Sequence, residues 1–441
     1  MQHVRRVRQL LLHSLLLGPL IGLAACSQDE ASDTAVRTTS TKTEVSVVGL
    51  VRTRTERTVT EPVSEELDVA DRNRPQSGLL TAGDHDDLLN PELYADYAGK
   101  FLQASGKDLP FVDTRTRVAV KVVGPSGRPV PFARVEVQRA GQPLRLVPAA
   151  DGTASFFPKF DNVPARTSIR VASKAGAVTR AIDLKNASAR RFEIAIPRTA
   201  RPVSAMDLAL VIDTTGSMGD EIDYLQAELD TIIDRLKRQA GNLDLRIGII
   251  VYRDEGDDYV VRSIPLTDDI GSIRDSLAEQ SANGGGGDQP EAVDQAMIAA
   301  DRMQWRADAA KAVLLIADAP PHEQAIEATL ESAQSLRSKG VHIVPVAASG
   351  VEDSAQYVMR TMAALTQGRY IFLTDDSGVG KPHAEPDVVC YVVSRLDQLI
   401  ARVLAGLAEG RRIEPAQDEV IRVVGDYDRG RCRAQQGADQ S

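Results

Sequence analysis

Carboxylates and hydroxyls recur at three places in this 441-residue chain where a metal ion could bind. One group alternates directly after an apolar run, one residue lies in a run of glycines, and one follows a second apolar run. The set is Asp213, Thr215, Ser217, Asp288 and Asp318. Such hard oxygen donors suit magnesium, manganese or calcium and not zinc or copper. The pattern predicts a divalent cation site, with Mg²⁺ as the first choice and Mn²⁺ or Ca²⁺ as alternatives.

Taken singly, these residues have ordinary structural explanations. Ser217 could cap a helix, and Asp318 could be a turn residue. Asp288 with Glu291 fits a capping box. Together, however, they come in order, and each is expected at the carboxyl end of a strand, where open parallel sheets bind ligands. We therefore favour metal binding.

The elements that must position these residues begin at Met206, where apolar runs start to alternate with amphipathic segments. This alternation indicates a doubly wound α/β domain with a mostly parallel sheet and helices on both faces. The predicted strands are 208–212, 245–252, 313–317, 341–346 and 370–373, with a short antiparallel edge strand at 260–264. The predicted helices are 220–239, 291–303, 323–339, 355–365 and 389–407.

The motif Asp213-x-Thr215-x-Ser217, followed by a glycine loop and Asp318, resembles the metal-ion-dependent adhesion site of von Willebrand factor type A domains. The likeness covers about residues 204–410. It implies a Rossmann-like fold with sheet order 3-2-1-4-5-6, in which the two hydroxyls contact the metal directly. The aspartates would bind it directly or through water, and one coordination position would remain for an oxygen of a partner.

One position departs from the family pattern, because Asp288 stands where threonine is usual. A third carboxylate would hold the metal more tightly and attract an acidic partner less. The wording around Asp254, Asp288 and Asp318 is most similar to the A domains attached to alpha-type protein kinases, although no kinase domain fits after Gly410. Asp254 and His322 are expected either behind the metal ligands or as local turn or cap residues.

A serine hydrolase is the alternative interpretation. Residues 215–219 are one substitution from the G-x-S-x-G nucleophile elbow, and Asp318 followed by His342 or His383 completes the order Ser, Asp, His. That chemistry would use Ser217 and leave Asp213 and the glycine loop without a role. We therefore expect no enzyme activity.

The first 25 residues have the pattern of a bacterial lipoprotein signal peptide. Arginines precede the apolar run Leu10–Ala25, which is short for a membrane-spanning helix, and small residues come directly before Cys26. This predicts cleavage before Cys26 and lipidation of its sulfur, so that the chain is anchored to a membrane of the cell envelope. Ser27 favours the outer membrane if the organism is Gram-negative. A cleaved secretory signal with an incidental cysteine is the alternative.

Cys390 and Cys432 are the two cysteines that remain after lipidation of Cys26. Exported proteins usually oxidise such pairs, so we predict a disulfide, with two free thiols as the alternative. The bond would fasten a C-terminal tail, residues 411–441, onto the preceding domain.

Two further regions precede the α/β domain. Residues 26–115 are predicted to be a disordered stalk with a short helical segment, because residues 27–75 are polar and contain no aromatic residue. Asp84, Asp86 and Asp87 are interpreted as a solvated helix start. Residues 116–200 alternate apolar and polar side chains at short spacing, which indicates a small all-β sandwich of antiparallel strands. This stretch resembles immunoglobulin-like or carboxypeptidase-regulatory-like domains.

The net charge of −10 argues against nucleic-acid binding, and no basic patch is expected to offset it. The prediction is therefore an envelope protein that uses a divalent metal to bind a protein or surface partner. A structural scaffold in envelope assembly, in which the metal only stabilises loops, is the second possibility.

Overall fold

The computed structural model describes residues 79–433 apart from 174–175, 186–189, 200, 242, 286–288, 349–350 and 379–385. The chain divides into two units, Met1–Glu66 and Leu67–Ser441, and all that follows concerns the second. The predictions for the signal peptide, Cys26, Asp288 and His383 therefore lie outside the described residues.

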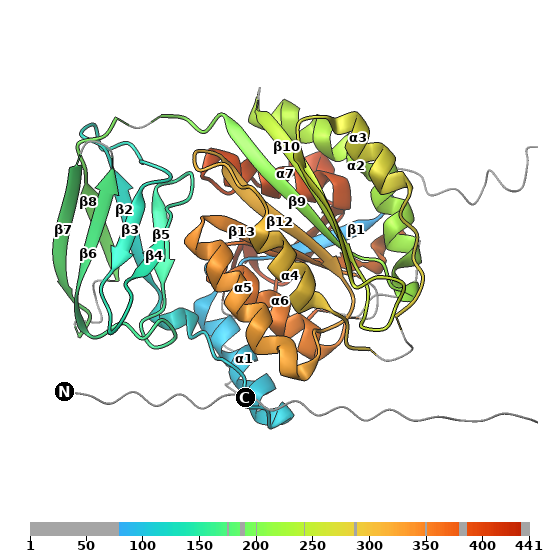
Figure 1. Ribbon diagram of the computed structural model, residues 1–441, viewed down its shortest axis with the longest axis horizontal. Helices are drawn as coiled ribbons and strands as arrows, with labels where there is room; N and C mark the ends of the chain where they lie inside the picture. Colours follow the sequence, from blue (N-terminus) through green and yellow to red (C-terminus); the bar gives the residue numbers. More distant parts are fainter. Residues whose placement is uncertain are drawn as a thin grey trace, which may run out of the picture. The chain divides into compact units, whose positions relative to one another are not determined.

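A nine-stranded sheet forms the centre of the α/β domain (Figure 1). Its strand order is β11-β10-β9-β12-β13-β14-β1-β15-β16. The first six strands confirm the predicted order 3-2-1-4-5-6, with five parallel strands and an antiparallel edge strand. In that order along the chain they are β9 Ala205–Asp213, β10 Asp244–Tyr252, β11 Val261–Thr267, β12 Ala310–Ala317, β13 Val341–Ala347 and β14 Tyr370–Thr374.

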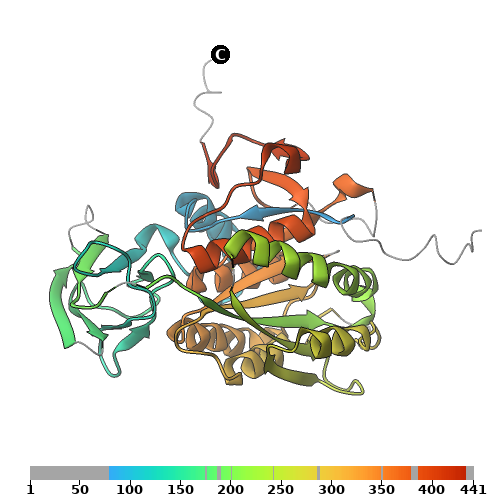
Figure 2. The same cartoon turned by 90° about the horizontal axis from the view of Figure 1, so that it is seen from above.

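Helices cover both faces of this sheet (Figure 2). The central strands are apolar on both sides for this reason, and every residue of β12 is buried. On one face lie α2 Gly219–Ala240, α3 Ile270–Ala278 and α7 Leu396–Glu409. On the other lie α1 Pro91–Ser105, α4 Val293–Arg302, α5 Ile326–Ser338 and α6 Asp353–Thr366. The predicted doubly wound fold is confirmed.

Two elements differ from the sequence-based prediction. The predicted helix 389–407 begins with a strand, β15 Tyr391–Arg395, whose adjacent Val392 and Val393 favour extended backbone. The helix α3 was not predicted, since its nine residues carry only two buried apolar side chains, Ile273 and Leu277.

The prediction of disorder is wrong for the described residues 79–115, although the short helical segment predicted within them is confirmed by α1. Strand β1, Thr81–His85, lies between β14 and β15 and runs antiparallel to both. Gly83 permits this packing, because a Cβ there would lie 2.7 Å from the ring of Phe372. Asp84 and Asp87, interpreted as solvated, are buried against arginines that come hundreds of residues later. Their partners could not be read from local sequence.

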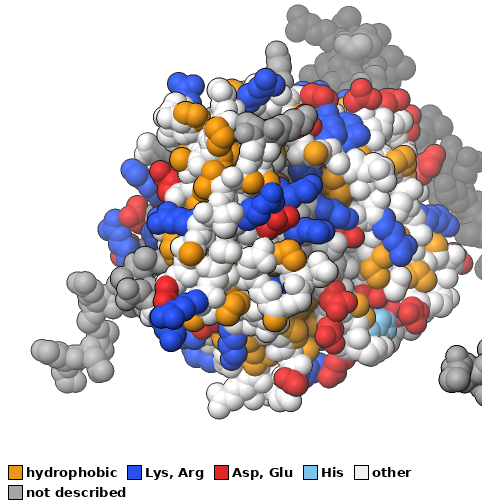
Figure 3. Space-filling view, turned by 60° about the vertical axis from the view of Figure 1, so that its left-hand side comes forward, with side chains coloured by type: hydrophobic (Ala, Val, Ile, Leu, Met, Phe, Trp, Pro, Cys, Tyr) orange, Lys and Arg blue, Asp and Glu red, His pale blue; other side chains and the backbone are white. Residues whose placement is uncertain are grey.

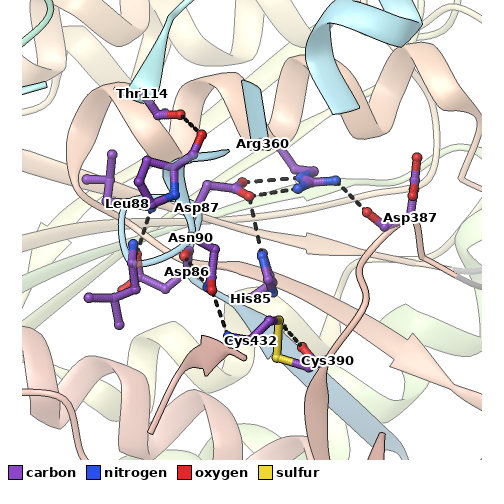
Figure 4. A network of polar contacts seen from close by, with 12 residues as sticks. His85, Asp86, Asp87, Leu88, Asn90, Thr114, Arg360, Asp387, Cys390 and Cys432 are labelled. Carbon is purple, nitrogen blue, oxygen red and sulfur yellow. Dashed lines mark hydrogen bonds and ion pairs between the residues drawn. A yellow bond between two sulfur atoms is a disulfide. The ribbon is translucent and has the colours of Figure 1, made fainter. Parts of the chain in front are cut away.

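A disulfide holds the C-terminal segment, and Figure 4 shows it near His85 of the inserted strand and Asn90. Strand β16 Arg422–Val424 pairs with β15, and β17 Tyr427–Asp428 pairs with β18 Arg431–Cys432. The predicted disulfide between Cys390 and Cys432 is confirmed. The Asn90 side chain donates to Gly430 O at 2.7 Å and accepts from Cys432 N at 2.8 Å.

A seven-stranded sandwich lies between α1 and β9 in the chain. One sheet has the order β5-β2-β8 and the other β4-β3-β6-β7, and the two share one apolar core. The strands β2 and β8 pair in parallel, where only antiparallel strands were predicted. The strands are β2 Val118–Val123, β3 Arg134–Val137, β4 Leu144–Leu146, β5 Thr153–Phe156, β6 Arg166–Ser173, β7 Gly176–Asp183 and β8 Arg191–Ala195.

Buried polar contacts join the sandwich to helix α5. Arg337 forms a bidentate ion pair with Asp161 at 2.9 and 3.0 Å and donates to Ser155 O at 2.6 Å. Ser155 also hydrogen-bonds Gln367. Within the described ranges, no helix is long and apolar enough to cross a membrane.

Candidate metal centre

Strand β9 delivers the first predicted ligands to the carboxyl edge of the sheet. It ends at Asp213, and the chain turns through a short 3-10 helix, Gly216–Met218, into α2. The Oδ1 atom of Asp213 accepts hydrogen bonds from Thr215 N at 2.9 Å and Thr215 Oγ1 at 2.7 Å. The Oγ atom of Ser217 lies 3.4 Å from Thr215 Oγ1, and Ser217 is an exposed residue. Asp213, Thr215 and Ser217 are thus brought together as predicted.

The glycine loop packs directly against this turn. Gly216 N donates to Gly284 O at 3.3 Å, and Asn283 N donates to Thr214 O at 3.0 Å. Gly285 has a φ of +87°, and a Cβ there would lie 2.9 Å from Thr215 Cβ. Glycine is required at this position both for the backbone conformation and for the close approach.

Asp318 follows β12, the strand next to β9. The parallel register pairs Ile316 with Ile212, so Asp318 and Asp213 leave the sheet at the same edge. Burial, and next the negative charge of Asp318, raise the pKa of Asp213 to about 7, although hydrogen bonds from Thr215 lower it. The two carboxyl groups are therefore close enough to disfavour each other's ionised form.

Glu291 is a member of this cluster that the sequence analysis assigned only to a capping box. Its side chain is buried, with 4% exposed, and its Oε2 atom has no hydrogen-bond partner among the described residues. Its backbone N donates to Pro320 O at 2.9 Å, which ties it to the loop after β12. Burial, and then the charges of Asp213, Asp254 and Asp318, raise its pKa to about 9.

Glu291 does not cap the helix that follows it. Helix α4 begins at Val293, with Ala292 at the N-cap and no side-chain cap hydrogen bond. Its position in the sequence could have assigned it to the site, because it lies two residues before a helix and shortly after the glycine loop. A residue there does not belong to an apolar helix face, so its carboxylate can face the site.

Asp254 and His322, expected behind the metal ligands or in local turns, contact each other. The Nε2 atom of His322 lies 2.6 Å from Asp254 Oδ1. They follow β10 and β12 respectively, and the charge of Asp254 acts on Glu291. The pair therefore borders the carboxylate cluster.

The arginine nearest in sequence does not neutralise the cluster. Arg253 donates to the carbonyl oxygens of Thr214 and Ser281, each at 3.2 Å, and its guanidinium lies 4.5 Å from the centre of the Tyr259 ring. It holds the loops together through their carbonyls. The charges that act on Asp213 and Glu291 are acidic.

These residues fit a hard divalent cation. A carboxylate oxygen of Glu291 is buried without a donor, and two hydroxyls lie beside the cluster, so oxygen ligands of the required type converge at one edge. No three His, Cys, Asp or Glu side chains in the described part of the chain are grouped closely enough to hold a metal by themselves. The hydroxyls of Thr215 and Ser217 would have to take part.

The geometry argues against the form of the hydrolase alternative that uses His342. His342 is the second residue of β13, so it lies at the amino edge of the sheet, opposite to Ser217. It is buried, and its Nδ1 atom lies 2.8 Å from Thr366 O. His342 therefore cannot act as a base for Ser217.

Comparison with known proteins agrees with this fold. Residues 207–382 match the family described as von Willebrand factor type A domain, and they form such a domain. Domains of this family typically bind a divalent cation through this kind of site, and they are commonly non-catalytic interaction modules.

Two curated relatives match part of the chain. The alpha-protein kinase vwkA of Dictyostelium discoideum is 29% identical over 138 residues, 28% of this chain and 20% of the kinase. A putative ariadne-like RING finger protein, R811, of Acanthamoeba polyphaga mimivirus is 26% identical over 188 residues, 38% of this chain and 18% of that protein. The match thus spans about a fifth of the length of either relative.

Similar solved structures include BatB from Bacteroides thetaiotaomicron, with 17% identity and a TM-score of 0.32 over 46% of this chain and 98% of that one. The pilus adhesin SpaC from Lactobacillus rhamnosus GG has 11% identity and a TM-score of 0.34 over 66% of this chain and 35% of the adhesin.

Proposed function

We propose that this protein binds a divalent cation, most readily Mg²⁺, at the carboxyl edge of the sheet and uses it to bind a partner. Thr215 and Ser217 would contact the metal through their hydroxyls. Asp213 and Asp318 would bind it directly or through water, with Asp288 and Glu291 as further carboxylates and Asp254 and His322 behind them. Mn²⁺ and Ca²⁺ are the alternative ions.

The observation that carries this proposal is the buried carboxylate of Glu291. Its Oε2 atom has no hydrogen-bond donor in the described structure, and the carboxylate lies in the field of four other acids, Asp213, Asp254, Asp257 and Asp318. Burying like charges together is costly unless a cation or a proton compensates them. A bound dication would supply that compensation and act as a Lewis acid toward an oxygen ligand of the partner.

The partner would be a protein or another surface ligand that offers an oxygen to the metal. Ser217 is exposed, so the open side of the site lies next to its hydroxyl. The excess of carboxylates favours a neutral oxygen, such as an amide or hydroxyl, over an acidic side chain.

We further propose that the chain is a lipoprotein of the cell envelope, anchored through Cys26. The disulfide between Cys390 and Cys432 supports this proposal, since such bonds persist in oxidising compartments. In a Gram-negative organism the anchor would lie in the outer membrane.

Calorimetric titration of Mg²⁺ and Mn²⁺ into residues 27–441 tests the metal site. We expect saturable binding that is lost in Asp213→Ala and Ser217→Ala. The matched control is Asp294→Asn, which changes a carboxylate that is also buried, three residues after Glu291. Absence of binding in the folded wild-type protein, or equal loss in the control, would overturn the proposal.

A scaffold role would leave a different signature. If the metal only stabilised the loops, Ser217→Ala would leave envelope assembly largely intact. If the metal binds the partner, the same variant abolishes partner capture, and a chelator does so in the wild-type protein.

A further inference from the structure

The β-sandwich is a basic domain within a chain that is acidic overall. Residues 116–200 contain 15 Lys and Arg but only 5 Asp and Glu, whereas residues 204–410 contain 17 and 34. The expectation that no basic patch offsets the net charge of −10 is therefore wrong. The overall charge is a sum of two opposite regions.

The outer face of the four-stranded sheet gathers part of this positive charge. In β3 and in β6, every second residue points into the core, as Val135 and Val171 do. The intervening residues of each strand therefore point to solvent. We call this surface the arginine face. It is defined by Arg134, Arg145, Arg166 and Arg170, all of which are exposed.

Two of the four arginines are paired within the face and two are not. Arg166 lies 3.0 Å from Asp183, and Arg170 lies 3.1 Å from Glu136. Arg134 and Arg145 have no ion pair among the described residues. Figure 3 shows Lys and Arg side chains spread over much of one side of the molecule.

We propose that the arginine face docks on the anionic phospholipid headgroups of a membrane. A guanidinium pairs with phosphate oxygens through two parallel hydrogen bonds, and 11 of the 15 basic residues are arginine. The outer side of this β-sheet presents these groups over three neighbouring strands, β4, β3 and β6, and not in a pocket, which suits an extended layer of phosphates better than one small anion.

The negative charge of the α/β domain would orient the protein at the membrane. The α/β domain is repelled by the same headgroups because its acidic residues outnumber its basic ones two to one. The sandwich would therefore approach the membrane first and hold the acidic metal site away from it. The inference rests on the proposed lipid anchor for placing the chain at a membrane, while the surface itself is independent of the metal.

Vesicle co-sedimentation of residues 27–441 tests the docking surface. The vesicles contain either equal parts phosphatidylglycerol and phosphatidylcholine or phosphatidylcholine alone, with EDTA present throughout. We expect binding to the anionic vesicles only, weakened at an ionic strength of about 0.15 M. Because EDTA removes divalent metal, failure of the metal site leaves this result unchanged, and palmitate labelling of the full chain tests the anchor separately.

Two double variants with equal change in charge locate the surface. Arg134→Gln/Arg145→Gln removes the unpaired arginines of the face, and Lys121→Gln/Arg191→Gln removes two exposed cations from the outer side of the other sheet. Each cation near an anionic membrane contributes about fivefold to affinity, so we expect a loss of about 25-fold in the first variant and under about threefold in the second.

Thermal unfolding confirms that both variants fold. Equal losses in the two variants, or equal binding to neutral vesicles, would overturn the assignment of this face. Equally tight binding to duplex DNA with the same losses would show a general phosphate-binding surface and would overturn the assignment to a membrane.

Discussion

The two ends of strand β9 carry aspartates that are equally buried and yet opposite in chemistry. Asp207, near the amino end, and Asp213, at the carboxyl end, are both 0% exposed. Arg246 and Arg306 form ion pairs with Asp207 at 2.8 Å. Although burial raises the pKa of Asp207, hydrogen bonds from these arginines leave it below its usual value. The pKa of Asp213 is instead raised to about 7.

The difference separates a sheet edge whose buried carboxylate is compensated by arginines of the chain from an edge whose buried carboxylates are not. At the amino edge each carboxylate oxygen is matched by guanidinium donors, so the network is complete without any further group. At the carboxyl edge the acids face one another, and the neighbouring Arg253 is directed to carbonyls. An edge that lacks its own cation is suited to take one from solution.

The largest expected effect is at the amino edge. Asp207→Asn removes the charge that two partly buried arginines share, and we expect the free energy of unfolding to fall by about 3 kcal/mol. Urea denaturation measures this loss. Mg²⁺ binding should remain, and a variant that lost metal binding while keeping its stability would reverse the comparison between the two edges.

Magnesium should produce the next largest effect, at the carboxyl edge. At a free Mg²⁺ concentration a hundred times the Kd, linkage raises the free energy of unfolding of the wild-type protein by about 2.7 kcal/mol. Asp213→Asn should show none of this gain, and EDTA should abolish it. Thermal or urea denaturation with and without Mg²⁺ provides the measurement, and a gain of equal size in Asp213→Asn would contradict the site.

A smaller effect is expected for the residue that only the structure assigned to the site. Glu291→Gln removes one carboxylate of the cluster, and we expect Mg²⁺ affinity to fall about tenfold, or about 1.4 kcal/mol. Calorimetry on Glu291→Gln and on the control Asp294→Asn compares the two. If the two variants bind Mg²⁺ alike, Glu291 is not part of the metal centre.

The smallest effect concerns pH at the amino edge. Burial lowers the pKa of His342 below 6.5, so the unfolded chain binds its proton first as the pH falls. The stability from this histidine is present above pH 6.5 and is lost as the pH falls below it. Between pH 6.5 and 5.5 we expect His342 to account for about 1 kcal/mol of the loss, and His342→Asn should show a correspondingly shallower slope.

The positions of the parallel strands and the first motif could be predicted because both are local in sequence, whereas the order of the strands in the sheet was implied by the family resemblance. Apolar runs alternating with amphipathic segments define strands and helices, and Asp213, Thr215 and Ser217 lie within five residues at a strand end. Asp288 lies outside the described residues, so its contribution to the site stays a prediction.

Other features could not be predicted because their causes lie far apart in the chain. Strand β1 has few apolar residues, and it is a strand only because β14 and β15 leave a place between them. The sequence pattern placed Glu291 in a capping box. Its position beside the acidic cluster depends on a contact with the loop after β12, which the local sequence does not record.

The sequence by itself determined most elements of the parallel sheet, the Asp213, Thr215 and Ser217 motif and the pairing of the two cysteines. These depend on residue type and on short-range periodicity, which a linear pattern records. Only the tertiary structure decided which carboxylates keep a cation of their own. Arg246 and Arg306 reach Asp207 from β10 and from the loop before β12, while no comparable group reaches Asp213 among the described residues. Charge compensation depends on distance in space, and it therefore separates the two edges of one sheet.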